Sequence, residues 1–385
     1  MRKLKYVDLI FYRLVPQLVR PLVVLFEGIY CNSNLLVSII SLNSLLIIST
    51  AVPCHIDFFK KEKLKNLTSY ISSIVQIIIF SLILSFLLYF TLFEQNILLA
   101  VISSLLFLID KLVDELARYN ELHKRYLKWF YLQFAKAAWP IFGMILFYFE
   151  YLEYNHAIFL VSFIVLIPLL YTFQSEFKIK LRDYNNTEGL LNIKDKITLT
   201  IGSFIPSVLL TGPRLFVSSF FPNIAHYFFV ATQLANTFNL MYNIKFSIPY
   251  RRIIAIKPYK YVKIIFGNTV TIMHFTFIIA LISYLLFEYN LDEVSNNHDV
   301  VIFTPILIIN AFLVAHFLNL VSVLHWVKAT DRIKTYVTYG FTFLLFVIGT
   351  TLAVYFNKWY LPTFLSILIS YALTYFTKWY LFNAK

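Results

Sequence analysis

Long apolar runs separated by short polar segments dominate this chain of 385 residues. A helix needs about 20 consecutive, mostly apolar residues to cross a bilayer, so each run of this length predicts one membrane-spanning helix. Twelve such runs cover residues 10–30, 34–54, 69–92, 97–115, 128–149, 156–174, 197–220, 225–247, 263–287, 300–323, 335–356 and 360–381. We therefore predict an all-α membrane protein of twelve spans.

The polar segments between these runs alternate between basic segments and segments almost without Lys or Arg. Of the 33 Lys and Arg residues, only Lys358 falls in the second kind of segment, and Arg20, Lys136 and Arg214 lie well inside spans. Loops on the cytoplasmic side of a membrane protein carry an excess of positive residues. We therefore expect both chain ends in the cytoplasm. The same distribution explains the net charge of +13, so no nucleic-acid partner is expected.

Composition favours the same class of protein. Hydrophobic residues make up 59% of the chain and charged residues 14%, whereas soluble proteins average about 25% charged residues. No polar segment is long enough to form a soluble domain. The first apolar run begins among charged residues and has no small-residue cleavage site, so we expect a retained helix rather than a cleaved signal peptide.

The first six and last six predicted spans resemble each other. Arg20–Pro21 lies in the middle of the first span and Pro213–Arg214 in the middle of the seventh. The second span ends at Pro53 and the eighth at Pro249. Because six is an even number, the two halves would be parallel repeats related by a pseudo-twofold axis along the membrane normal. The expected domains are a six-helix lobe at 1–174, a cytoplasmic linker at 175–196 and a second six-helix lobe at 197–385.

Polar residues form stripes inside several predicted spans. A mid-span Arg or Lys costs about 2.5–3.5 kcal/mol in lipid, so such residues should face protein or water. Arg20 and Arg214 have no evident buried carboxylate at their own depth, and we interpret them as lining a water-filled cavity. Lys136 could do the same or could extend to the inner interface. Further cavity-lining candidates are Arg13, Gln17, Gln133, Thr211, Gln233, Asn236, His274 and His316.

A structural role is the alternative for many of these residues. Ser, Thr, Asn and Gln commonly join membrane helices through hydrogen bonds, and the two histidines could be ordinary core residues. Near the inner end of the fourth span, Asp110, Asp114, Glu115 and Arg118 are expected to form a solvated ion-pair network.

Prolines in the first and seventh spans favour a transport pathway. Pro16 and Pro21 in the first span, and Pro206 and Pro213 in the seventh, are expected to break or kink these helices next to the mid-membrane arginines. No catalytic or metal-binding spacing is present, and Cys31 and Cys54 lie near opposite ends of the first helical hairpin. We expect neither an enzyme nor a bound cofactor or metal.

Two segments resemble a known family. The segment that follows the fourth span, DKLVDELARYNELHKRYLKWFYLQFAKAAWPIF, contains Asp114, Glu115 and Arg118 in an acidic-acidic-x-x-Arg pattern. The hairpin at 210–252 has Arg214 before an apolar turn, then His226–Tyr227, and a span that ends in Pro-Tyr. Both are similar to Wzx-type lipid-linked oligosaccharide (O-antigen) flippases of the multidrug/oligosaccharidyl-lipid/polysaccharide exporter superfamily. The turn at 29–34 departs from the family, which usually has Gly and Tyr there.

This resemblance implies a function. Such proteins move an undecaprenyl-pyrophosphate-linked oligosaccharide, a building unit of lipopolysaccharide O-antigen or another surface polysaccharide, from the inner to the outer leaflet by alternating access. The family's cationic central cavity would correspond to Arg20, Arg214 and Lys136. The resemblance also implies the bacterial inner (plasma) membrane, an ion gradient (H⁺ or Na⁺) or membrane potential as energy source, and polysaccharide polymerase and chain-length proteins as partners.

Two other functions are compatible with a multispanning basic protein. A polymerase or ligase of the same pathway would usually have a long outer loop with Arg or His, but the longest outer segment here, 288–299, contains no Lys or Arg. A seven-span chemoreceptor has a comparable length, and the C-terminal TYFTKWYLF is spaced like a gustatory-receptor tail. The even number of predicted spans argues against that class.

Overall fold

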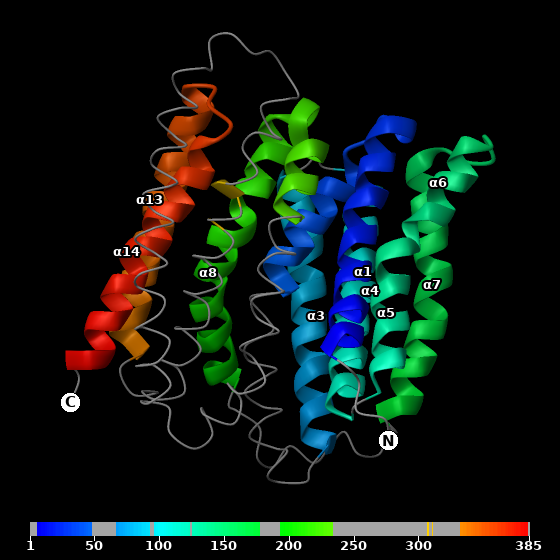
Figure 1. Cartoon of the computed structure of the whole chain (residues 1–385), viewed down its shortest axis with the longest axis horizontal. Helices are drawn as coiled ribbons and strands as arrows, with labels where there is room; N and C mark the ends of the chain where they lie inside the picture. The colour runs from blue at the N-terminus through cyan, green and yellow to red at the C-terminus, as the bar shows by residue number, and fades with distance from the viewer. Residues whose placement is uncertain are drawn as a thin grey trace. The chain divides into compact units, whose positions relative to one another are not determined.

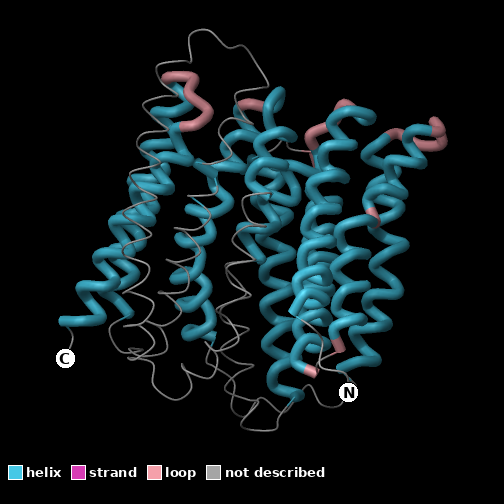
Figure 2. The backbone as a smooth tube through the Cα atoms, in the orientation of Figure 1, coloured by secondary structure: helices cyan, strands magenta, loops and turns pink. Residues whose placement is uncertain are grey.

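The computed structural model describes residues 6–47, 67–92, 96–123, 125–177, 193–233, 306–307, 310 and 332–383. Every regular element in these ranges is a helix (Figure 2), which confirms the all-α prediction for this part of the chain. The helices are α1 (Tyr6–Phe26), η1 (Glu27–Cys31), α3 (Leu67–Leu92), α4 (Ile97–Leu122), α5 (Tyr126–Ala138), α6 (Pro140–Tyr148), α7 (Tyr154–Phe177), α8 (Ile193–Phe220), α13 (Arg332–Tyr355) and α14 (Leu361–Asn383). Residues 35–47 and 222–233 are also helical.

The chain divides into two compact units, residues 1–204 and 205–385, and each is described by itself. In the first unit, α1, α3, α4, α5 and α7 lie side by side, and α6 continues in the direction of α5 (Figure 1). Helix α4 occupies the middle because it packs against α3, α5 and α7, while α1 packs against α5 and α6 against α7. The side chains of α4 therefore meet neighbours on several faces.

Several helices are long and apolar enough to cross a membrane. Among the described residues these are Leu14–Cys31, Tyr126–Tyr148 and Tyr154–Glu176, and shorter apolar helices cover Leu35–Ile47, Ile78–Thr91, Phe343–Tyr355 and Leu361–Leu373. Large apolar side chains are exposed along α7, for example Phe163 and Ile167 at 52% and 60%. Exposed apolar surface of this extent suits lipid rather than water. The chain is thus compatible with a membrane protein, while the count of twelve spans stays a prediction.

One prediction about the spans needs correction. The chain is helical through Pro16 and Pro21 in α1, and through Pro206 and Pro213 in α8, so the expected breaks at these prolines are wrong. The predicted span 128–149 is found as the apolar stretch Tyr126–Tyr148, in which Trp139 separates α5 from α6. Pro140 has no N–H to donate to the carbonyl of Lys136 four residues earlier, which is a physical reason for the break.

In the second unit, α8 packs against the C-terminal helices. The Ser366 hydroxyl of α14 donates a hydrogen bond to the Leu209 carbonyl of α8. Gly212 allows a close approach of α13, since a Cβ atom there would lie 2.9 Å from the ring of Phe346. Helix α13 in turn packs against α14. Helices α13 and α14 thus both contact α8.

Candidate functional site

The most strongly charged buried region of the described chain lies where α1, α4 and α5 meet. Helix α4 contributes Asp110 and Asp114, which are four residues apart and therefore share one helical face. Arg20 comes from α1 and Lys136 from the last turn of α5. With the neighbouring α4 residues Lys111, Glu115 and Arg118, these residues are called the charged cluster below.

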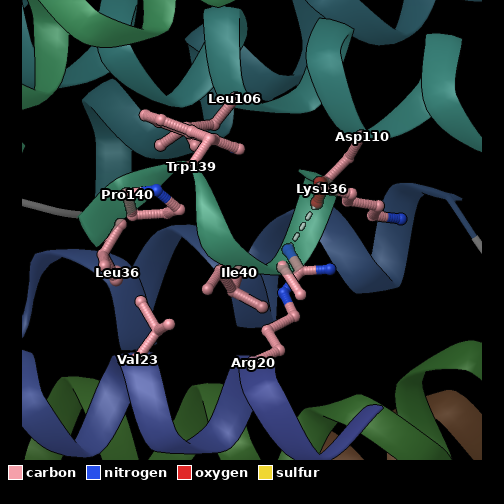
Figure 3. A pocket seen from close by; sticks show the side chains of 10 residues that line it. Arg20, Val23, Leu36, Ile40, Leu106, Asp110, Lys136, Trp139 and Pro140 are labelled. Atoms are coloured by element: carbon pink, nitrogen blue, oxygen red, sulfur yellow. Dashed lines mark hydrogen bonds and ion pairs between the residues drawn. The ribbon is translucent and has the colours of Figure 1, made fainter. Parts of the chain in front are cut away.

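The first half of the charged cluster links three helices by short contacts. The Nη2 atom of Arg20 donates to Asp110 Oδ2 at 2.6 Å. Lys136 Nζ lies 2.8 Å from Asp114 Oδ1 and 3.9 Å from Asp110 Oδ1, so it is within ion-pair distance of both carboxylates. Gln133 donates to the same Asp114 oxygen at 3.3 Å. Figure 3 shows Arg20 reaching from α1 toward Asp110, with Lys136 beside them.

The second half lies on α4 itself. Lys111 Nζ is 3.1 Å from Glu115 Oε1, and Arg118 Nη1 lies 3.0 Å from both Glu115 oxygens. The side chains of Lys111 and Glu115 are completely buried. The prediction of a solvated network is therefore wrong for Asp110 and Glu115, which are buried, whereas Asp114 and Arg118 are partly exposed. The reason is that α4 packs against three neighbouring helices.

The environment of Arg20 also differs from the prediction. We expected no buried carboxylate at its depth, but Asp110 is 3% exposed and directly bonded to Arg20, whose side chain is 20% exposed. In sequence, Asp110 lies in the predicted fourth span without any indication that it reaches the first. Only the packing of the helices brings the two residues together. The charged cluster then contains four cations and three carboxylates.

A small pocket adjoins the charged cluster. Its lining combines Arg20, Asp110 and Lys136 with apolar side chains such as Val23, Leu106 and Trp139 (Figure 3). The pocket volume is about 10 Å³, roughly what one water molecule requires. In this arrangement the pocket has no room for an oligosaccharide or a pyrophosphate. A large anion would enter only if α1, α4 and α5 moved apart.

The second predicted arginine lies in a different environment. Arg214 is 4% exposed, and its guanidinium carbon lies 5.8 Å from the centre of the Phe229 ring. Ser207, Thr211 and Ser218 of the same helix are also buried. Their spacing from Arg214 places them on one helical face. Thr211 itself donates to the Ser207 carbonyl, so its hydroxyl is satisfied within the helix.

The structure describes some of the other predicted cavity-lining residues and not the rest. Gln17 is partly buried, and its Oε1 atom is buried without a hydrogen-bond partner. Gln133 contacts the charged cluster through its hydrogen bond to Asp114. Gln233, in helix 222–233, is partly exposed. The side chain of Arg13, and Asn236, His274 and His316, lie outside the described residues. Arg20 and Lys136 are thus the predicted site residues that the structure brings together.

Two features were missed at the sequence level. Helix α14 carries Thr363, Ser366 and Ser370, all completely buried and spaced to share one face. That spacing is visible in the sequence and could have been recognised. Glu27 and Tyr154 form a hydrogen bond although they are 127 residues apart, and no local pattern indicates such a pair.

The charged cluster offers groups that can bind an anion. Arg20 supplies a planar guanidinium and Lys136 a mobile ammonium group, and both can bind phosphate oxygens. Among the described residues, no group of three His, Cys, Asp or Glu side chains is arranged to hold a metal ion.

Comparison with known proteins adds no identification. No protein-family model matches the chain. No curated protein and no solved structure matches it either.

Proposed function

We propose that this protein is a flippase of the bacterial plasma membrane that moves undecaprenyl-pyrophosphate-linked oligosaccharide from the inner to the outer leaflet. The proposal retains twelve spans in two six-helix lobes, with both chain ends in the cytoplasm. The carrying observation is the charged cluster, in which Arg20 and Lys136 lie among apolar helices. Charged groups at such positions in membrane proteins usually mark the path of a substrate or ion.

The carboxylates of the charged cluster suit a reversible anion site. A buried cation without a partner is strongly destabilising, so Asp110 and Asp114 would hold Arg20 and Lys136 in place when no substrate is bound. A pyrophosphate carries about two negative charges and accepts the paired N–H groups of Arg. It would replace the carboxylates as the partner of both cations. Arg214 would provide a further cation in the second half of the chain.

The small size of the pocket supports alternating access as the mechanism. A volume of about 10 Å³ excludes the substrate, so the helices around Arg20 would have to separate to admit the headgroup. The buried hydroxyl groups on α8 and α14 could then bind the sugar, while the lipid tail remains in the bilayer.

Alanine substitution of the two arginines tests this proposal. We expect Arg20→Ala and Arg214→Ala to abolish surface polysaccharide while the protein still accumulates in the membrane. Lys at either position should retain part of the activity, because it keeps the charge but loses the paired N–H groups. The surface polysaccharide would be measured on intact cells in which the chromosomal gene for this protein is deleted and the variant gene is supplied on a plasmid. Arg125→Ala is the matched control, since Arg125 is 46% exposed in a surface ion pair. Normal polysaccharide in the double Ala variant would refute the proposal.

Reporter fusions test the proposed topology separately. A reporter that is active only outside the cytoplasm should be active when fused near residues 32, 94, 153 and 293, and inactive near 62, 120, 186 and 256. Activity at both 120 and 153 would contradict the twelve-span arrangement.

A further inference from the structure

The end of α1 has an unusual local structure. After Phe26 the chain forms the π-helix η1, which ends at Asn32 with a φ angle of 46°. π-Helical turns are rare and occur frequently at functional sites. Asn is among the few residues that adopt left-handed backbone angles readily, so it suits this position. The next helix, residues 35–47, begins immediately afterwards.

Glu27, the first residue of η1, connects three separate segments. It is completely buried. Its Oε1 atom accepts a hydrogen bond from the Leu36 backbone N–H at 2.8 Å and another from the Tyr154 hydroxyl at 3.0 Å. Leu36 lies in the first turn of helix 35–47, where N–H groups lack partners within the helix and a negative charge is favourable. Tyr154 is the first residue of α7.

Glu27 and Arg20 therefore hold the same stretch of chain at two places. Arg20 binds α4 through Asp110, and seven residues later Glu27 binds helix 35–47 and α7. If α1 moves away from α4 to admit a substrate, the hydrogen bonds of Glu27 must either break or remain and act as the hinge of the movement. Of the two hydrogen bonds of Glu27, the one to Tyr154 is expected to break first, because Tyr154 is far from Glu27 in the chain. The bond to Leu36 should persist, because Leu36 follows Glu27 closely.

We propose that Glu27 and Tyr154 form a latch that fastens the end of α1 to α7 and opens when α1 moves during transport. The opening of the latch during transport rests on the proposed function. Its location on the outer side of the membrane rests on the proposed topology. The latch itself is defined by the contacts of Glu27. Breaking the Tyr154 contact should loosen η1 without removing the Leu36 contact.

Cys31, at the end of η1, provides a natural reporter. It is a free, half-buried thiol, and the chain contains only one other cysteine, Cys54. In a Cys54→Ser background, the rate at which a small uncharged maleimide labels Cys31 would be measured on open membrane fragments, which the reagent reaches from both sides. The variants are Tyr154→Phe, which removes only the hydroxyl, and Glu27→Ala, which removes the carboxyl group and with it both contacts. Tyr148→Phe, at a residue 68% exposed, is the matched control.

We expect Tyr154→Phe to raise the labelling rate by up to about tenfold, the upper end of what one hydrogen bond contributes. Glu27→Ala should raise it at least as much, and Tyr148→Phe should leave it unchanged. Equal labelling rates in Tyr154→Phe and the parent would overturn the latch, as would an equal rise in the Tyr148→Phe control.

The transport role of the latch has its own measurement. In parent cells that produce lipid-linked oligosaccharide, Cys31 labelling should be faster than in cells in which its synthesis is switched off. If Tyr154→Phe raises the rate of Cys31 labelling, but the labelling rate of the parent is the same with and without the oligosaccharide, the link between the latch and transport would be overturned. Failure of the flippase proposal is seen separately, as normal polysaccharide in the Arg20→Ala, Arg214→Ala double variant.

Discussion

Arg20 and Arg214 occupy similar places in the sequence but different environments in the fold. Each stands next to a proline in the middle of an apolar stretch. Arg20 is bound at 2.6 Å by a carboxylate from another helix, within a cluster that contains three further cations. Arg214 is more deeply buried, lies over the Phe229 ring and shares its helical face with hydroxyl groups.

The difference shows two ways of keeping a guanidinium among apolar helices. A carboxylate partner neutralises the charge, and removing that partner leaves an expensive buried cation. An aromatic ring provides a weaker attraction, about 2 kcal/mol or more when the pair is desolvated. A phosphate that binds Arg20 must compete with Asp110. The two arginines thus differ in environment even though their sequence contexts match.

The largest expected effect concerns Asp110. We expect Asp110→Leu to lower the free energy of unfolding by about 3–5 kcal/mol, because Arg20 and Lys136 then lose a buried carboxylate. Arg20→Met should cost less, since Lys136 Nζ still lies 3.9 Å from Asp110. The double variant should recover much of the loss, giving a coupling energy of about 3 kcal/mol. Unfolding of the purified protein by SDS in mixed micelles would measure it. A coupling energy below about 0.5 kcal/mol would mean that the pair behaves like a surface ion pair.

A smaller coupling is expected in the second region. In a double-mutant cycle of Arg214→Met and Phe229→Leu, the coupling energy should be about 2 kcal/mol, typical of a desolvated cation above an aromatic ring. The same unfolding assay applies, so the two cycles can be compared directly. A coupling as large as that of Arg20 with Asp110 would contradict the distinction between the two environments.

The smallest effect should come from an exposed ion pair in the first unit. Glu176 lies 3.1 Å from Arg125 and 2.9 Å from Lys128, whose side chains are 46% and 60% exposed. Glu176→Gln should lower stability by less than about 1 kcal/mol, and the loss should shrink at high salt because exposed charges are screened. If the loss of stability exceeded about 2 kcal/mol and did not depend on salt, the exposed interaction would be as strong as the buried pair of Arg20 and Asp110, and the difference in burial would not explain their energies.

The sequence predicted the helical class well, and it predicted individual site residues less well. Apolar runs of spanning length predicted helices where α3, α4 and α7 are found, because burial in lipid demands continuous apolar stretches. The prolines were misleading, since α1 and α8 stay helical through theirs while the break occurs before Pro140. A proline removes one backbone hydrogen bond, but neighbouring groups decide whether the helix tolerates the loss.

What the sequence by itself determined are properties that depend on residues close together in the chain. The apolar runs, the one-sided placement of Lys and Arg, and the shared face of Thr211 and Arg214 are of this kind, because helical periodicity acts over a few residues. The partners that charged groups find on other helices were decided only by the tertiary structure. Arg20 and Asp110 are 90 residues apart, and Glu27 and Tyr154 are 127 apart. Whether a buried charge meets a carboxylate, a ring or water depends on how the helices pack, and no local pattern records that packing.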